Sequence, residues 1–154
     1  MLGTTAAPGG PDDRRARVFT RIDHVGIAVP DLDAAKDFYR ETFGMRVVHE
    51  EENAEQGVRE AMLAVAPGAA TQVQLLAPLH ETSTIARFLD RSGPGVQQVA
   101  YTVDDIEETS ATLRRRGMRL LYDQPRRGTA GSRVNFVHPK DAGGVLVELV
   151  EPAR

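Results

Sequence analysis

The stretch RIDHVGIAVPDLD (residues 21–33) decides the fold, because GVQQVAYTVDD (residues 95–105) repeats its pattern later in the chain. Each stretch is rich in β-branched and other apolar residues, which favours a strand. Each then reaches aspartates that are suited to cap a helix. Alignment of the two stretches places His24 on Gln98, 74 residues further along. The sequence therefore predicts an internal duplication in which one copy carries histidine and the other glutamine.

Each copy continues into the same order of elements. In the first copy we expect strands at residues 22–29, 45–51, 58–65 and 71–76, and a helix that Asp31 caps and Gly44 ends. In the second copy we expect strands at residues 96–103, 118–122, 133–138 and 145–150, and a helix that begins at Asp104 or Asp105 and ends at Gly117. A short helix is expected between the copies, at residues 83–90. The predicted class is α+β: two tandem βαβββ modules form a curved mixed sheet around a central site, with the helices outside.

The domain boundaries follow from this repeat. We expect residues 1–17 to be a disordered N-terminal tail, because they are rich in glycine, proline, alanine and charge. A single domain then covers residues 18–152, with module one at 21–78, a linker helix at 79–94 and module two at 95–150.

The composition limits the classes of function. With 27% charged and 41% hydrophobic residues, the chain suits a soluble globular protein, and a net charge of −3 gives no general basic field for nucleic acid. The absence of cysteine excludes disulfides and thiolate metal sites and fits a cytoplasmic protein. No apolar run has the length of a membrane span. An arginine cluster at residues 114–127 is either a solvated surface or a site for an anionic ligand.

Four polar residues fall on strands that otherwise look buried. Gln74 and Glu148 are separated by the same 74 residues as His24 and Gln98. The duplication therefore predicts that the four side chains meet at one centre. A buried carboxylate such as Glu148 is costly unless it is paired or binds a metal.

The sequence resembles the vicinal oxygen chelate (glyoxalase/bleomycin resistance) superfamily, and within it the methylmalonyl-CoA epimerases. The resemblance covers about residues 21–150. It is carried by the stretches IDHVGIAVPDLDAAKDFYRETFGM, EENAEQGVREAML, TQVQLLAP, VDDIEETSATLRRRGMRLLYDQPRRG and NFVHPKDAGGVLVELV. It implies paired modules around a divalent metal, usually in a homodimer, and an acyl-CoA or similar small carboxylated substrate.

The resemblance also implies roles for individual residues. The family's metal ligands map onto His24, Gln74 and Glu148, whereas the fourth ligand, a histidine in the family, is replaced by Gln98. The family's proposed acid/base residue maps onto Glu60. The opposite face of the substrate would be served by Glu148 or by water.

Glutamine at the fourth position changes the expected metal. An amide oxygen is a harder and weaker ligand than imidazole, so the set favours Co²⁺, Mn²⁺ or Mg²⁺ over Zn²⁺. Three functions stay open. The first is an epimerase, an isomerase that removes and returns an α-proton through an enolate. The second is a diverged enzyme for another carboxylated or biosynthetic substrate, and the third is a metal-free ligand-binding protein.

Further residues are candidates for substrate binding. Gln97 adjoins the fourth ligand position, and Ser132 and Arg133 lie in a glycine-rich loop suited to a carboxylate or phosphate. His138 and Lys140 precede the last strand, near the substrate entrance of the family. His49 and His80 have no motif around them, and we expect both on the surface.

Overall fold

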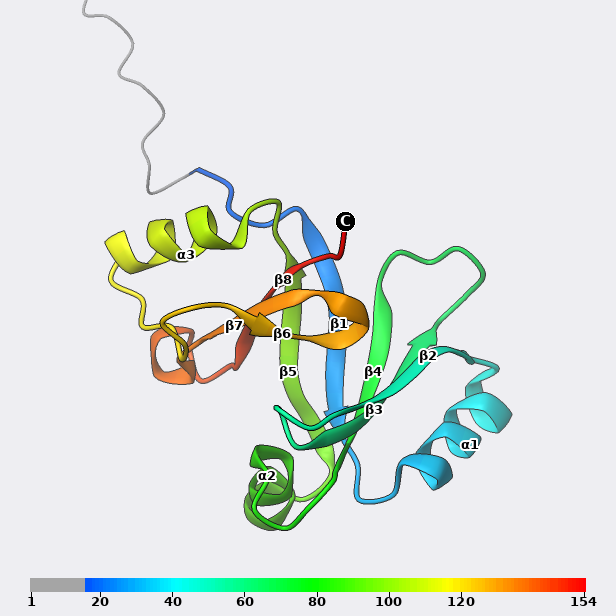
Figure 1. Cartoon of the computed structure of the whole chain (residues 1–154). Helices are drawn as coiled ribbons and strands as arrows, with labels where there is room; N and C mark the ends of the chain where they lie inside the picture. The colour runs from blue at the N-terminus through cyan, green and yellow to red at the C-terminus, as the bar shows by residue number, and fades with distance from the viewer. Residues whose placement is uncertain (1–15) are drawn as a thin grey trace, which may run out of the picture.

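The computed structural model describes residues 16–154 (Figure 1). The expected N-terminal tail falls almost wholly outside these residues. The helices are α1 (Leu32–Phe43), α2 (Thr84–Ser92) and α3 (Ile106–Arg115). The strands are β1 (Arg21–Ala28), β2 (Arg46–Asn53), β3 (Val58–Ala64), β4 (Gln72–Pro78), β5 (Gly95–Thr102), β6 (Arg126–Arg127), β7 (Arg133–Val137) and β8 (Val147–Glu151). Short 3₁₀ turns lie at Thr129–Gly131 and Pro139–Asp141.

All of these strands belong to one mixed sheet, in the order β2-β3-β4-β1-β5-β8-β7-β6. The duplication is visible in the pairing, because β1 pairs with β4 in parallel just as β5 pairs with β8 in parallel. An antiparallel β1·β5 ladder joins the two halves. The predicted α+β class and the repeated module are confirmed.

The helix boundaries follow the capping residues expected from the sequence. Asp31 accepts a hydrogen bond from the backbone of Ala34, and Gly44 ends α1 in the left-handed conformation with φ of 70°. Asp105 caps α3 in the same way as Asp31 caps α1. The linker helix α2 is present and is capped by Ser83.

The strand expected at residues 118–122 was wrong. Only Leu120 pairs there, in an isolated bridge to Val137. The reason is Asn135, whose side chain accepts a hydrogen bond from the backbone N–H of Tyr122 and donates one to its carbonyl. A buried amide thus replaces the ladder of a regular strand, and the short strand β6 takes the edge of the sheet instead.

The core is divided between the two surfaces of the sheet. Under α1, Leu32 packs with Leu63 and Leu75, and under α3, Ile106 packs with Leu149. Two further clusters border the central site, one around Leu76, Val58 and Ile85 and the other around Val134, Phe136 and Val150. Among the described residues, no helix is long and apolar enough to cross a membrane.

Candidate functional site

One polar side chain from each of six adjacent strands contributes to the site. Across the sheet from β2 to β8 they are Glu51, Glu60, Gln74, His24, Gln98 and Glu148. The last five are at most 6% exposed, although most of their strand neighbours are apolar. The duplication thus brings together the four residues predicted to share a centre, and Glu60 lies on the neighbouring strand.

The amide nitrogen of Gln98 lies where the other three side chains converge. Gln98 Nε2 donates to Gln74 Oε1 at 3.2 Å and makes a short hydrogen bond to Glu148 Oε2. It also lies 3.5 Å from His24 Nε2. Three groups that can accept from a donor or bind a cation therefore point to one position.

His24 is held between two carboxylates. Its Nδ1 lies 2.7 Å from Asp23 Oδ2, and its Nε2 lies 3.2 Å from Glu148 Oε2. Burial opposes a charge on the ring, but the hydrogen bonds and charges of both carboxylates outweigh it and raise the pKa of His24 to about 9. A carboxylate on the second ring nitrogen is the usual support of a metal-binding histidine.

Glu60 is a buried carboxyl group with specific hydrogen-bond donors. Thr129 Oγ1 donates to Glu60 Oε1 at 2.6 Å, and Gln74 Nε2 donates to Glu60 Oε2 at 3.0 Å. Burial raises the pKa of Glu60 to about 7. The Thr129 hydrogen bond opposes this shift, whereas Glu51 and Glu148 add to it. A carboxyl group that titrates near neutrality is suited to both give and take a proton.

Glu51 forms a pair with Glu60 across the β2·β3 ladder, where the two residues are register partners. Although burial raises the pKa of Glu51, hydrogen bonds with His49, Glu60 and the backbone N–H of Ala130 together lower it. Of the two carboxyl groups, Glu60 therefore holds a proton to the higher pH.

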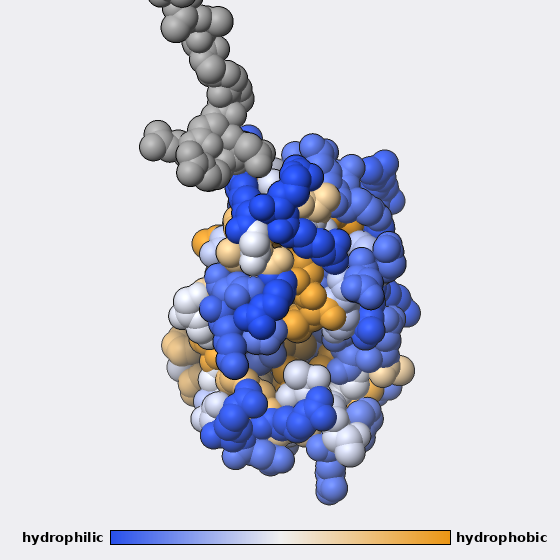
Figure 2. All heavy atoms as spheres, turned by 90° about the vertical axis from the view of Figure 1, so that its left-hand side faces the viewer, coloured by the Kyte–Doolittle hydropathy of each residue, from blue (hydrophilic) through white to orange (hydrophobic). Residues whose placement is uncertain are grey.

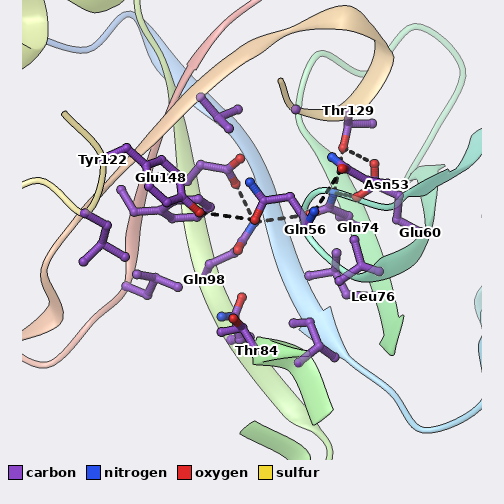
Figure 3. Close-up of a pocket in the computed structure, with 18 residues that line it drawn as sticks. Asn53, Gln56, Glu60, Gln74, Leu76, Thr84, Gln98, Tyr122, Thr129 and Glu148 are labelled. Atoms are coloured by element: carbon purple, nitrogen blue, oxygen red, sulfur yellow. Dashed lines mark hydrogen bonds between the residues drawn. The ribbon is translucent and has the colours of Figure 1, made fainter. Parts of the chain in front are cut away.

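The polar centre forms one wall of a cavity of about 650 Å³, shown in Figure 3. Apolar residues of both modules line it, namely Val58, Leu76, Ile85, Leu121, Val134, Phe136 and Leu146. Tyr122 and Gln56 also line the cavity, and the guanidinium of Arg126 stacks 3.8 Å from the centre of the Tyr122 ring. Figure 2 shows apolar side chains gathered in a hollow between polar surfaces, on the face that looks to the left in Figure 1.

The donor set fits a divalent cation. His24 Nε2, Gln74 Oε1 and Glu148 Oε2 already surround one position, and rotation of the Gln98 amide would present its oxygen to the same position. Three of the four donors would then be oxygen atoms, which favours Co²⁺, Mn²⁺ or Mg²⁺ over Zn²⁺.

The remaining candidates are placed unequally. Gln97 lines the cavity at a β-bulge, because Gly26 faces Gln98 while the next residue, Ile27, faces Val96. Ser132 is buried beside a second hollow, which is also bordered by His24 and Glu148.

Three of the expected substrate-binding residues lie outside the cavity lining. Arg133 forms ion pairs with Glu107 and Glu151. His138 and Lys140 lie in a 3₁₀ turn, where the His138 ring accepts a hydrogen bond from the Lys140 backbone. A role for these three in substrate binding stays a prediction.

The sequence reasoning missed Thr129, Glu51 and the role of His49. Thr129 contacts both Glu60 and Gln74, yet it lies in an irregular loop without periodicity. His49 was expected on the surface, and it is half-buried and bonded to Glu51. The strand alternation that places Glu60 also predicts the position of its partner Glu51, once the β2·β3 register is known.

Comparisons with known proteins agree with this geometry. A sequence profile of the Glyoxalase/Bleomycin resistance protein/Dioxygenase superfamily matches residues 23–136. The chain is 40% identical over 131 residues to an ethylmalonyl-CoA/methylmalonyl-CoA epimerase of Cereibacter sphaeroides, covering 84% of this chain and 96% of the relative. The mitochondrial methylmalonyl-CoA epimerase of Mus musculus is 38% identical over 130 residues, covering 84% and 71% of the two chains.

Two solved structures show the same fold. The crystal structure of methylmalonyl-CoA epimerase from Mycobacterium tuberculosis is 55% identical, with a TM-score of 0.86 and coverage of 100% of this chain and 94% of that one. A methylmalonyl-CoA epimerase in complex with methylmalonyl-CoA and NH₄⁺ is 51% identical, with a TM-score of 0.83 and coverage of 88% and 96%.

Proposed function

The chain belongs to the Glyoxalase/Bleomycin resistance protein/Dioxygenase superfamily, and we propose that within it the chain is a methylmalonyl-CoA epimerase. This membership confirms the resemblance seen in the sequence. The observation that carries the proposal is Glu60, a buried carboxyl group with a pKa of about 7 that is hydrogen-bonded to Gln74 of the polar centre.

The reaction inverts the carbon between a thioester and a carboxylate. Glu60 takes the α-proton, and the electron pair of the broken C–H bond passes into the thioester to form an enolate. Thr129 and Gln74 each donate to one oxygen of Glu60, so they orient its carboxylate toward the cavity wall that it shares with the centre. A proton returned to the other face of the planar carbon, by Glu148 or by water, completes the inversion.

The proposal includes a divalent cation held by His24, Gln74, Glu148 and the amide oxygen of Gln98. When bound, such an ion supplies Lewis acidity toward the substrate oxygens. Asp23 supports this role from behind, because it fixes the ring of His24 through Nδ1. Co²⁺, Mn²⁺ or Mg²⁺ is proposed before Zn²⁺, for the reasons of ligand hardness given above.

The cavity suits the acyl and thioester part of an acyl-CoA substrate. Its two apolar walls come from different modules and flank the polar centre, so an alkyl group and a carboxylate find complementary surfaces. Gln97 would bind the substrate from the bulge. Ser132, Arg133, His138 and Lys140 are proposed to bind it outside this cavity wall.

A homodimer is part of the same proposal. Ile22 and Val96 lie on the two central strands, and they are 45% and 60% exposed, an unusual state for large apolar side chains at the middle of a sheet. Light scattering coupled to size exclusion measures the mass directly. A monomer at micromolar concentration would contradict this part of the proposal.

Epimerisation is tested with one stereoisomer of methylmalonyl-CoA in D₂O. Deuterium should enter the α-position with inversion, and the rate should rise when Co²⁺ or Mn²⁺ is added to protein stripped of metal. Ethylmalonyl-CoA and malonyl-type thioesters with other substituents form the comparison panel. The proposal fails if methylmalonyl-CoA shows no α-exchange at high protein concentration with any of these ions.

A further inference from the structure

The turn that carries Thr129 is held in a conformation that its own sequence disfavours. Ala130 has φ of 54° and ψ of 39°, which makes it the one non-glycine residue with positive φ in the described part of the chain. Alanine in this left-handed region costs about 1–2 kcal/mol. Contacts outside the turn must offset that cost, or the turn would relax.

Glu51 provides the contact at the strained residue. The backbone N–H of Ala130 donates to Glu51 Oε1 at 3.1 Å. The other oxygen, Oε2, lies 3.0 Å from His49 Nε2, so the carboxylate is fixed from two sides. Glu51 thus binds the turn at the residue directly after Thr129.

The turn is also shaped by its own closure. Gly128 donates its backbone N–H to the Ser132 carbonyl at 2.9 Å, and Ser132 donates to the Thr129 carbonyl at 3.1 Å. A side chain at Gly128 would meet Val134 at 2.4 Å, so the turn approaches β7 as closely as a backbone can. These contacts close the loop on itself, whereas the Glu51 contact ties it to β2.

We propose that Glu51 is a positioning residue, which anchors the strained Ala130 turn so that the Thr129 hydroxyl stays on Glu60 Oε1. The chain of contacts runs from Glu51 to Ala130 and through one peptide unit to Thr129. The Thr129 hydroxyl then lies 2.6 Å from Glu60. Glu51 does not touch the substrate in this role, and His49 holds its carboxylate in place. The inference rests on the proposed function, because it concerns the group that removes the α-proton.

The test is a double-mutant cycle on epimerisation of methylmalonyl-CoA. Glu51→Ala should lower kcat about 10- to 100-fold with KM changed less than about twofold, because the base is misplaced while the substrate site is intact. Thr129→Val should cause a similar loss. In the Thr129→Val background, Glu51→Ala should have little further effect, since both changes remove the same hydrogen bond.

Two further variants separate positioning from general damage. Glu51→Gln retains an oxygen that accepts from Ala130, and it should restore kcat to within about threefold of the unaltered protein. Glu52→Ala is the matched control, because Glu52 is the exposed neighbour on the same strand, and its kcat should be unchanged. Equal kcat losses from Glu51→Ala with and without Thr129 would overturn the proposal.

A readout that needs no catalysis keeps the two proposals distinguishable. Amide hydrogen exchange at Ala130, followed by NMR, should be slow in the unaltered protein and in Glu51→Gln, and fast in Glu51→Ala. Unchanged protection in Glu51→Ala would overturn the anchor even in a protein without epimerase activity. Conversely, loss of protection together with absent epimerisation by the unaltered protein would refute the proposed function and leave the anchor standing.

Discussion

Gly26 faces Gln98 across the β1·β5 ladder, and a Cβ at Gly26 would lie 2.5 Å from Cγ of Gln98. The glycine therefore provides the space in which the Gln98 side chain reaches the centre. Its φ is outside the left-handed region, so the requirement is one of space and not of backbone conformation.

Gly26→Ala should displace Gln98 and weaken the site. We expect a loss of stability of about 1–3 kcal/mol, as for other overpacked interiors, and a lower affinity for Mn²⁺. Denaturant unfolding and metal titration by calorimetry measure the two effects. Gly44→Ala is the control for added volume, because no atom lies within 4 Å of a Cβ there, although its φ of 70° adds strain of its own. Unchanged metal affinity in Gly26→Ala would contradict the role given to Gln98.

Gln98→His should raise metal affinity, because imidazole is a stronger ligand than an amide oxygen. We expect a gain of about 10- to 100-fold for Co²⁺, and a larger relative gain for Zn²⁺. Gln97→His is the matched control, since it adds a histidine at the bulge one residue away. An equal gain in both variants would show that position 98 is not a ligand.

Glu60→Gln should abolish most of the α-proton exchange, by about 10²–10⁴-fold, because the amide cannot take the proton. In the unaltered protein, the rate should rise with pH through the pKa of about 7, since the ionised form is the base. A pH–rate profile of kcat measures this directly. A flat profile between pH 5.5 and about 8.5 would contradict the assignment of Glu60 as the base.

The same carboxyl group should make stability depend on pH in protein free of metal. The pKa of Glu60 rises from 4.5 to about 7 on folding, so folding favours its protonated form. Its contribution is fully present below pH 4.5 and is lost as pH rises through about 7. The free energy of unfolding should then fall by up to about 3 kcal/mol relative to Glu60→Gln. A difference between the two proteins that does not change from pH 4.5 to 8 would refute the shifted pKa.

Asn135→Leu should release the segment before β6. Asn135 is fully buried, and it satisfies both backbone groups of Tyr122, so its removal leaves a buried donor and acceptor without their partner. We expect a loss of about 2–4 kcal/mol in unfolding free energy, from two lost hydrogen bonds. Val134→Ala on the same strand tests simple loss of packing, and it should not increase amide exchange at Tyr122 as Asn135→Leu does.

Much of this architecture could be predicted because the signals are local or repeated. Asp31, Ser83 and Gly44 mark helix ends through their own side chains or backbone freedom. The shift of 74 residues then identified the pairs His24/Gln98 and Gln74/Glu148 before any contact was known. The repeat worked because equivalent strands in a duplicated sheet present equivalent positions to the centre.

The rest depended on contacts between distant segments. Nothing in residues 118–122 distinguishes them from an edge strand, because the disruption comes from Asn135 on another strand. Thr129 lies 69 residues from Glu60, in a turn whose conformation is maintained by Glu51. Such contacts are set by the register of strands and by loop closure, which sequence periodicity does not encode.

The duplicated sheet has a consequence for how such a site evolves. Glu60 belongs to the first copy and Glu148 to the second, on strands whose partners lie largely within their own half. A mutation that retunes one carboxylate therefore leaves the surroundings of the other mostly unchanged. An ancestral symmetric pair would have treated both sides of a substrate alike. Divergence of the halves lets selection adjust each side separately, and the glutamine at position 98 is one visible step of that divergence.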